Sequence, residues 1–190
     1  MQVLLMMGPP GAGKGTQARR LIEEYGWAYL ATGDLLRQEI QAGTPLGQNI
    51  QALVESGKLI PDELIVSLVE KQLQEGQTYL LDGFPRTVGQ AEALEALLRR
   101  KNARLLGVLF LDVPQEVLLE RIAGRAQAEN RADDNLSVFR IRLEEYRQKT
   151  LPLVSYYEKK GLLRKVNGVG SIEEVHRRLK AKVEELLTQA

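Results

Sequence analysis

Hydrophobic positions along the chain follow two spacings, and their alternation predicts an α/β fold. Short apolar runs typical of buried strands occur five times, and segments with apolar residues at helical spacing separate them. Strands that alternate with helices favour a mainly parallel sheet covered on both faces. We therefore expect a three-layer sandwich with a five-stranded parallel sheet, in one domain over residues 1–190. The predicted strands are 3–7, 27–31, 79–82, 106–111 and 162–166.

Helix boundaries are marked by Gly, Pro and capping residues. Asp34 is expected to cap the helix that follows it, and Ser171 with Glu174 has the pattern of a capping box for the last helix. Two short helices after the second strand predict a small excursion from the sheet. The predicted helices are 17–25, 35–40, 46–55, 62–73, 88–100, 112–123, 137–160 and a final one that begins near 171.

A glycine-rich loop, Gly8 to Thr16, connects the first strand to the first helix, which is the context of a phosphate-binding loop. Glycines let several backbone N–H groups point inward, and the helix adds unpaired donors and its positive dipole end. Lys14 supplies a charge for the β- and γ-phosphates, and the Thr16 hydroxyl is placed to hold Mg²⁺. The generic pattern has a hydroxyl where this chain has Gly15, so a plain Gly/Pro-rich turn stays the alternative.

Two aspartates end predicted strands and are candidates for a Mg²⁺ carboxylate. Ligands gather at the carboxyl ends of parallel strands, and enzymes with a phosphate-binding loop place an acid there. Asp82 is followed by Gly83, which permits close approach of a ligand, and then by Arg86. Asp112 precedes a helix start, where a carboxylate also caps the helix. We favour Asp82 as the residue that holds the metal, through water, and a structural role for Asp112.

Arginines are numerous near those strand ends. Each alone is typical of a solvated surface charge, but with the phosphate-binding loop the set predicts a cluster that neutralises polyphosphate. Their number indicates a second anionic substrate. If the acceptor is itself a phosphate, it is mostly deprotonated at neutral pH and no general base is needed. The single histidine, His176, is expected to face solvent and to have no catalytic role. The arginines are Arg37, Arg86, Arg121, Arg125, Arg131 and Arg142.

Composition restricts the classes of partner. The 190 residues carry a net charge of +1, which gives no reason to expect nonspecific binding to nucleic acid or membranes. The absence of cysteine excludes disulfides and thiolate metal sites and suits a reducing cytoplasm. No apolar run approaches the length that spans a bilayer. We expect a cytoplasmic protein without nucleic-acid or membrane partners.

Four motifs together resemble the adenylate kinase family of nucleoside monophosphate kinases. They are Gly8 to Thr16, Thr32-Gly33-Asp34-Leu35-Leu36-Arg37, Asp82-Gly83-Phe84-Pro85-Arg86-Thr87 and Arg131-Ala132-Asp133-Asp134, and the match extends to Asn167-Gly168. Asp-Gly-Phe-Pro-Arg in register with the glycine loop is highly specific to these kinases, and the Gly15-Thr16 ending is usual among them. The resemblance implies a P-loop kinase fold, a monomer, and reversible phosphoryl transfer, MgATP + AMP ⇌ 2 ADP, with Mg²⁺ as cofactor and ATP as co-substrate.

The resemblance also implies the two mobile subregions and the site residues. Residues 32–60 correspond to the AMP-binding region, and 124–134 to a short lid without zinc-binding cysteines. The residues implied for ATP and its Mg²⁺ are Gly11, Ala12, Gly13, Lys14, Gly15, Thr16, Arg121, Arg125, Gly170 and Asp82. Those implied for AMP are Thr32, Arg37, Lys58, Leu59, Ile60, Gly83, Phe84, Pro85, Arg86 and Gln90, and Arg131 and Arg142 would clamp the transferring group. The implied catalytic set is Lys14, Arg86, Arg125, Arg131 and Arg142.

Three alternatives stay open at this point. UMP/CMP kinases share the short lid, but usually carry alanine in place of Thr32 and asparagines in place of Thr87 and Gln90, so Thr32 and Gln90 favour AMP. A GTPase or ATPase switch would need a guanine-reading N-K-x-D motif, which the chain lacks. A non-catalytic nucleotide-binding module is the third alternative, and substitution of Lys14 separates it from an enzyme.

Overall fold

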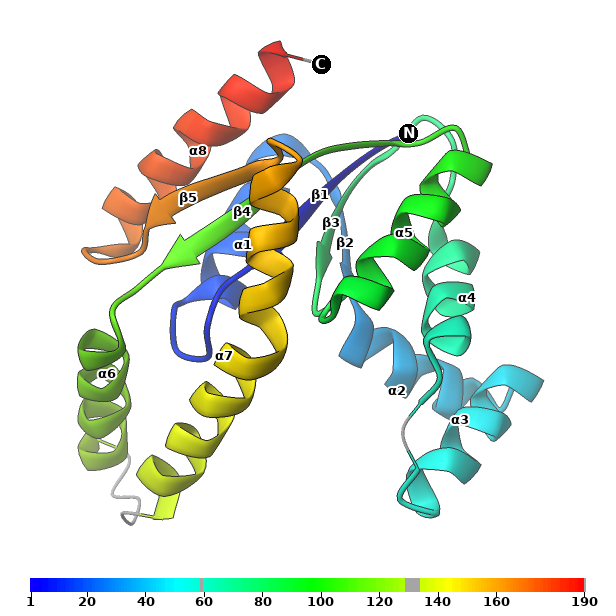
Figure 1. Cartoon of the computed structure of the whole chain (residues 1–190), viewed down its shortest axis with the longest axis horizontal. Helices are drawn as coiled ribbons and strands as arrows, with labels where there is room; N and C mark the ends of the chain where they lie inside the picture. The colour runs from blue at the N-terminus through cyan, green and yellow to red at the C-terminus, as the bar shows by residue number, and fades with distance from the viewer. Residues whose placement is uncertain (59, 129–133, 190) are drawn as a thin grey trace.

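A five-stranded parallel sheet forms the centre of the protein (Figure 1). The computed structural model describes residues 1–58, 60–128 and 134–189, with the backbone alone for 125–128 and 134–136. The strand order is β2-β3-β1-β4-β5, and every neighbouring pair is parallel, which confirms the predicted α/β sandwich. The strands are β1 (Gln2–Met7), β2 (Ala28–Ala31), β3 (Thr78–Asp82), β4 (Arg104–Asp112) and β5 (Leu163–Asn167).

Eight helices occur within the described residues, and their positions follow the predicted order. The predicted capping box is confirmed, because Ser171 and Glu174 exchange side-chain and backbone hydrogen bonds at the start of α8. The helices are α1 (Lys14–Tyr25), α2 (Thr32–Ala42), α3 (Pro45–Glu55), α4 (Asp62–Gln72), α5 (Val88–Arg100), α6 (Gln115–Ala128), α7 (Asp134–Lys159) and α8 (Ile172–Thr188).

Two predictions of a capping carboxylate at a helix start, Asp34 and Asp112, were wrong. Helix α2 begins at Thr32, directly at the end of β2, so its N-cap is Ala31 and Asp34 lies in the first turn. Helix α6 begins after Pro114 and continues to Ala128, and Asp112 is the last residue of β4 rather than a helix cap. Both errors have one cause: each helix begins within three residues of the end of a strand, so a carboxylate near the junction does not mark the boundary. Of the predicted lid, 124–128 belong to α6 and 129–133 lie outside the described residues.

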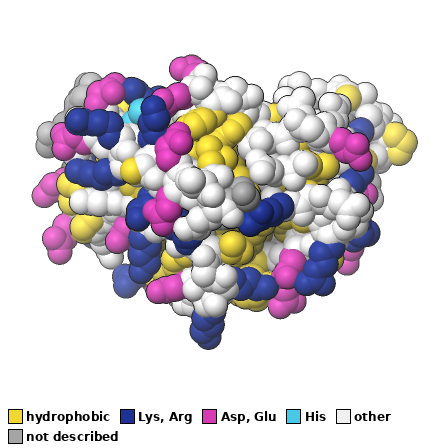
Figure 2. Space-filling view, turned by 90° about the horizontal axis from the view of Figure 1, so that it is seen from above, with side chains coloured by type: hydrophobic (Ala, Val, Ile, Leu, Met, Phe, Trp, Pro, Cys, Tyr) yellow, Lys and Arg dark blue, Asp and Glu magenta, His cyan; other side chains and the backbone are white. Residues whose placement is uncertain are grey.

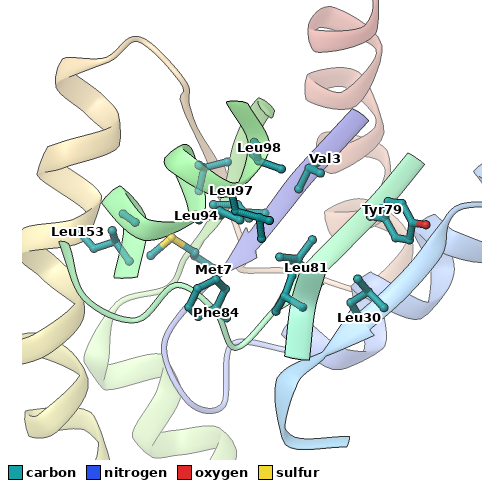
Figure 3. Packing of buried hydrophobic residues seen from close by; sticks show 14 of the residues in the cluster. Val3, Met7, Leu30, Tyr79, Leu81, Phe84, Leu94, Leu97, Leu98 and Leu153 are labelled. Atoms are coloured by element: carbon teal, nitrogen blue, oxygen red, sulfur yellow. The ribbon is translucent and has the colours of Figure 1, made fainter. Parts of the chain in front are cut away.

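The sheet is covered on both faces because its strands alternate their side chains. Val3, Leu5 and Met7 of β1 point into a cluster with α4, α5 and the second half of α7, part of which Figure 3 shows. Leu4 and Met6 point into the opposite cluster with α1, α8, α6 and the first half of α7. All five of these side chains are buried. Burial on both faces explains why β1 is apolar throughout rather than alternating.

The carboxyl ends of the strands lie at one edge of the sheet, where the predicted site residues are expected. The loop from β1 to α1 lies there, with α6 and the start of α7 projecting on one side and α2 and α3 on the other (Figure 1). Figure 2 shows a different face, seen from above the view of Figure 1, on which Lys/Arg and Asp/Glu side chains are interspersed rather than separated by sign. Among the described helices, none combines the length and apolarity that a bilayer crossing requires.

Candidate active site

The glycine loop leaves the first backbone donors of α1 free for a ligand. Gly11 and Gly13 have φ angles of +85° and +88°, a region that favours glycine, and the turn is closed by a hydrogen bond from the Ala12 N–H to the Pro9 carbonyl oxygen. Gly13 is the N-cap of α1 and supplies no side-chain bond, and the first turn contains no acid. The N–H groups and the positive dipole end therefore face the loop uncompensated, which favours an anion.

Lys14 and Asp82 form an ion pair at the centre of the site. The Lys14 Nζ lies 2.5 Å from Asp82 Oδ1, and the two side chains are 30% and 11% exposed. Asp82 is the last residue of β3, and its Cα pairs with that of Met6 near the end of β1. Parallel pairing thus brings the acid beside the glycine loop, as expected for the favoured carboxylate.

A cleft of about 590 Å³ opens between the glycine loop, the segment after β3 and α7. Positive charge predominates in its lining, and Glu145 is the acid among the lining residues. Such a lining suits a polyphosphate, because guanidinium and ammonium groups bind its oxygens directly. Of the predicted set, it brings together Lys14, Arg86 and Arg142. The cationic lining residues are Lys14, Arg19, Arg86, Arg142 and Lys149.

Sequence analysis missed Lys149 and Tyr146 in this lining. They follow Arg142 by seven and four residues on α7, so all three share one helix face. Once Arg142 is assigned to the site, this spacing predicts that Tyr146 and Lys149 face the same cleft. Arg19 was also missed, because it lies on α1 beyond the recognised loop motif.

A second cavity, of about 400 Å³, adjoins the first across the same loop. Both are lined by 11–13 and Thr16. Arg121 reaches into the second cavity from α6 and donates hydrogen bonds to the carbonyl oxygens of Gly11, at 3.2 Å, and Gly168, at 2.8 Å. Gly170 completes the wall. The predicted adenine contacts, Arg121 and Gly170, thus lie together beside the glycine loop.

The Asp-Gly-Phe-Pro-Arg motif follows β3 and contacts the start of α2, directly after β2. Arg86 donates from Nε to the Gly83 carbonyl oxygen at 2.9 Å, and its backbone N–H donates to Gln90 Oε1 at 2.8 Å. Gln90 Nε2 donates to Asp62 Oδ1 at 3.0 Å, a partner that sequence analysis missed. Thr32 is buried and lies against Gly83. The structure therefore brings Thr32, Gly83, Arg86 and Gln90 into one connected group.

Other residues implied for AMP lie differently. Arg37 is exposed and paired with Asp34, three residues earlier on α2. Pro85 lines the cleft, whereas the Phe84 side chain is buried in the hydrophobic core and is not among the residues that line the cleft. Lys58 is exposed.

Ile60 is half-buried in the connection from α3 to α4, and Leu59 in the same connection lies outside the described residues. Arg131 also lies outside them, as does the side chain of Arg125.

The expectation that His176 faces solvent was wrong. Its ring is 12% exposed, and Nε2 lies 2.7 Å from Glu24 Oε2. Helix α8 packs on α1 over one face of the sheet, and this contact encloses the imidazole. His176 therefore joins two helices and takes no part in the loop site.

The residues at the loop fit a Mg²⁺ ion that is held together with a nucleotide. Within the part of the chain that the structure describes, no group of three or more His, Cys, Asp or Glu side chains could enclose a metal. Mg²⁺ typically takes one or two carboxylates, several waters and substrate phosphates rather than an all-protein cage. Asp82 at the strand end and Thr16 on the cleft wall provide that partial set.

Comparison with known proteins agrees with this geometry. The family described as adenylate kinase matches residues 6–162. An adenylate kinase of Thermus thermophilus is 51% identical over 180 residues, which cover 95% of this chain and 96% of the relative. An adenylate kinase of a Synechococcus strain is 52% identical over 182 residues, covering 95% and 97%. One of Xanthomonas campestris is 45% identical over 179 residues, covering 93% and 96%. With the phosphate-binding loop, its acid and the arginine-lined cleft on one sheet edge, the chain belongs to the adenylate kinase family of phosphotransferases.

Proposed function

We propose that the cleft at the glycine loop transfers the γ-phosphoryl group of MgATP reversibly to AMP, giving two molecules of ADP. One observation carries the proposal: two cavities share the same glycine loop, and one of them is lined by five cationic side chains. Two phosphorylated molecules repel each other, so a site that joins them needs this excess of positive charge.

The donor occupies the loop and the second cavity. The phosphates accept hydrogen bonds from the backbone of residues 11–16, and Lys14 exchanges Asp82 for phosphate oxygens as they arrive. The adenine lies against Arg121 and the backbone near Gly170. The proposed role of Arg125 rests on the family pattern alone.

The acceptor occupies the region built on residues 32–60 and the segment after β3. Thr32, Gly83 and Gln90 recognise the nucleotide, and Arg86 binds its phosphate. Arg37, Lys58, Leu59, Ile60, Phe84 and Pro85 complete the proposed set. Arg142 contacts the transferring group from α7, and Arg131 does so by analogy with the family.

Asp82, through water, and Thr16 would hold Mg²⁺, which supplies charge neutralisation on the phosphates when bound. The acceptor phosphate is already ionised at neutral pH, so catalysis consists of positioning and electrostatic stabilisation by Lys14, Arg86 and Arg142. We also infer a cytoplasmic protein, because the absence of cysteine suits a reducing compartment, and a monomer, as the family resemblance implies.

A panel of nucleoside monophosphates with ATP as donor tests the proposal. AMP should give the highest kcat/KM, and both the donor and the acceptor should be converted to ADP. Faster turnover with CMP or UMP would overturn the choice of acceptor. ATP hydrolysis that AMP does not redirect into ADP would overturn phosphoryl transfer itself.

A further inference from the structure

The Asp82 carboxylate has a different partner on each oxygen. Oδ1 lies 2.5 Å from the Lys14 ammonium, and Oδ2 accepts a hydrogen bond of 2.5 Å from the Tyr29 hydroxyl. Tyr29 belongs to no motif recognised in the sequence. It is nevertheless the one hydroxyl that contacts the favoured metal carboxylate among the described side chains.

Strand pairing explains why the tyrosine reaches this carboxylate. β2 pairs with β3 in parallel, with Tyr29 opposite Leu80 and Ala31 opposite Asp82. Paired residues share a face of the sheet and alternate residues share it too, so Tyr29 and Asp82 point to the same side. This is the side covered by α1, where Tyr29 packs against the buried cluster that includes Ala18 and Leu21 of α1. The phenol oxygen extends from there toward the strand end.

The two partners differ in how firmly they hold the carboxylate. Lys14 carries its charge on a flexible four-carbon stem at the start of α1, and in the proposed function it turns toward the phosphates. The Tyr29 ring is half-buried between a strand and a helix, and its aromatic side chain has only two rotatable bonds. The tyrosine contact therefore remains when Lys14 leaves.

The hydrogen-bond geometry leaves the two carboxylate oxygens in different surroundings. The Tyr29 hydroxyl donates to Oδ2, whereas Oδ1 faces the Lys14 ammonium. Among the described side chains, Lys14 is the partner of Oδ1, so this oxygen becomes available to another ligand once Lys14 has turned toward the phosphates.

We propose that Tyr29 is a positioning residue, which fixes the Asp82 carboxylate by Oδ2 so that Oδ1 faces the water shell of nucleotide-bound Mg²⁺. The proposal rests on the proposed function, since it takes Asp82 as the metal carboxylate. Groups that orient metal ligands typically contribute 10- to 100-fold to metal affinity. The chain offers a matched control: Tyr25 donates to Glu184 Oε1 at 2.6 Å, in the contact between α1 and α8, away from the cleft.

The test compares Tyr29→Phe with Tyr25→Phe by binding rather than by turnover. ATP affinity is measured by calorimetry with and without Mg²⁺, and Mn²⁺ occupancy of the ATP complex by electron paramagnetic resonance. Tyr29→Phe should weaken metal-dependent ATP binding about tenfold. Metal-free ATP binding should stay within about twofold, because the phosphate-binding backbone is untouched. Tyr25→Phe should change neither quantity.

A double-mutant cycle shows whether Tyr29 acts through Asp82. On an Asp82→Asn background, Tyr29→Phe should add no further loss of metal-dependent binding. The proposal would be overturned if Tyr29→Phe weakened ATP binding equally with and without metal. It would also be overturned if Tyr29→Phe weakened metal-dependent ATP binding as much on the Asp82→Asn background as in the wild type. Failure of the proposed function looks different: the wild-type protein would then form no ADP from ATP and AMP, whatever Tyr29→Phe does to metal binding.

Discussion

The Cβ atom that Gly83 lacks would lie 2.8 Å from the hydroxyl oxygen of Thr32. Gly83 also has a φ angle of +87°, so its conformation and its close contact both require glycine. The turn after β3 is thereby held against the first residue of α2. This contact joins the Asp-Gly-Phe-Pro-Arg motif to the proposed AMP-binding region, although fifty residues of chain separate them.

Gly83→Ala should therefore damage AMP use as well as stability. The clash and the left-handed backbone are expected to lower the free energy of unfolding by about 1–3 kcal/mol. Displacement of Thr32 or Arg86 should lower kcat/KM for AMP by about 10- to 100-fold, since a shift near 1 Å has that effect in other enzymes. Urea unfolding and steady-state kinetics measure the two changes. Gly76→Ala is the control, with a φ of +79° and open space around it: it should lose stability without losing AMP specificity.

Lys14→Met removes the ammonium but keeps an unbranched side chain of similar length. We expect kcat to fall by about 100- to 1000-fold, the effect of removing one preorganised stabiliser of developing charge. Lys182→Met, which removes a lysine near Glu185 on the exposed surface of α8, should leave kcat unchanged. Turnover by Lys14→Met within tenfold of the wild-type value would contradict the assigned role.

Gly47→Ala should disrupt the crossing of α2 and α3. The new Cβ would lie 2.0 Å from the Glu39 carbonyl oxygen, which is backbone and cannot rotate away. We expect the free energy of unfolding to fall by about 3 kcal/mol or more, at the upper end for overpacking. Gly124→Ala, at an exposed position of α6 with open space around it, should instead stabilise the protein by about 1 kcal/mol through helix propensity. Thermal unfolding of both variants measures the contrast, and similar melting temperatures would refute the packing argument.

Acid should weaken the same helix pair through Glu39. Hydrogen bonds from Lys71, at 2.8 Å, and from Thr44 hold the pKa of this buried carboxyl below its ordinary value of 4.5. A lowered pKa in the folded state gives stability that is present above pH 4.5 and lost as the pH falls through the lowered value. The difference in unfolding free energy between wild type and Glu39→Gln should thus shrink below pH 4.5. A difference that stays constant from pH 7 to pH 3 would exclude the carboxylate as its cause.

Much of the fold was predictable because its signals are local. Strands buried on both faces must be apolar throughout, so β1 and β4 were recognisable without knowledge of their neighbours. The glycine loop was recognisable for the same reason, since its glycines and Lys14 lie within a few residues of one another. Even the proximity of Asp82 to the loop followed from the rule that parallel strands present their carboxyl ends together.

Contacts between distant segments were not predictable in this way. Glu24 and His176 are separated by 152 positions, and the packing of α8 on α1 decided that the imidazole is enclosed. Gln90 and Asp62 lie 28 positions apart and meet only because the start of α4 lies beside α5. In neither pair does the sequence around one residue indicate which distant residue it will contact.

By itself the sequence determined the parallel α/β architecture, the phosphate-binding loop, and Asp82 and Arg86 beside it, because each depends on local spacing or on strand direction. Only the tertiary structure decided which oxygen of Asp82 meets Lys14 and which meets Tyr29, and that two cavities adjoin one loop. The physical reason is that hydrogen bonds and cavities depend on the distances between side chains from separate strands and helices, and a change of a few tenths of an ångström makes or breaks them. Those distances exist only after the apolar faces have packed and set the strand register.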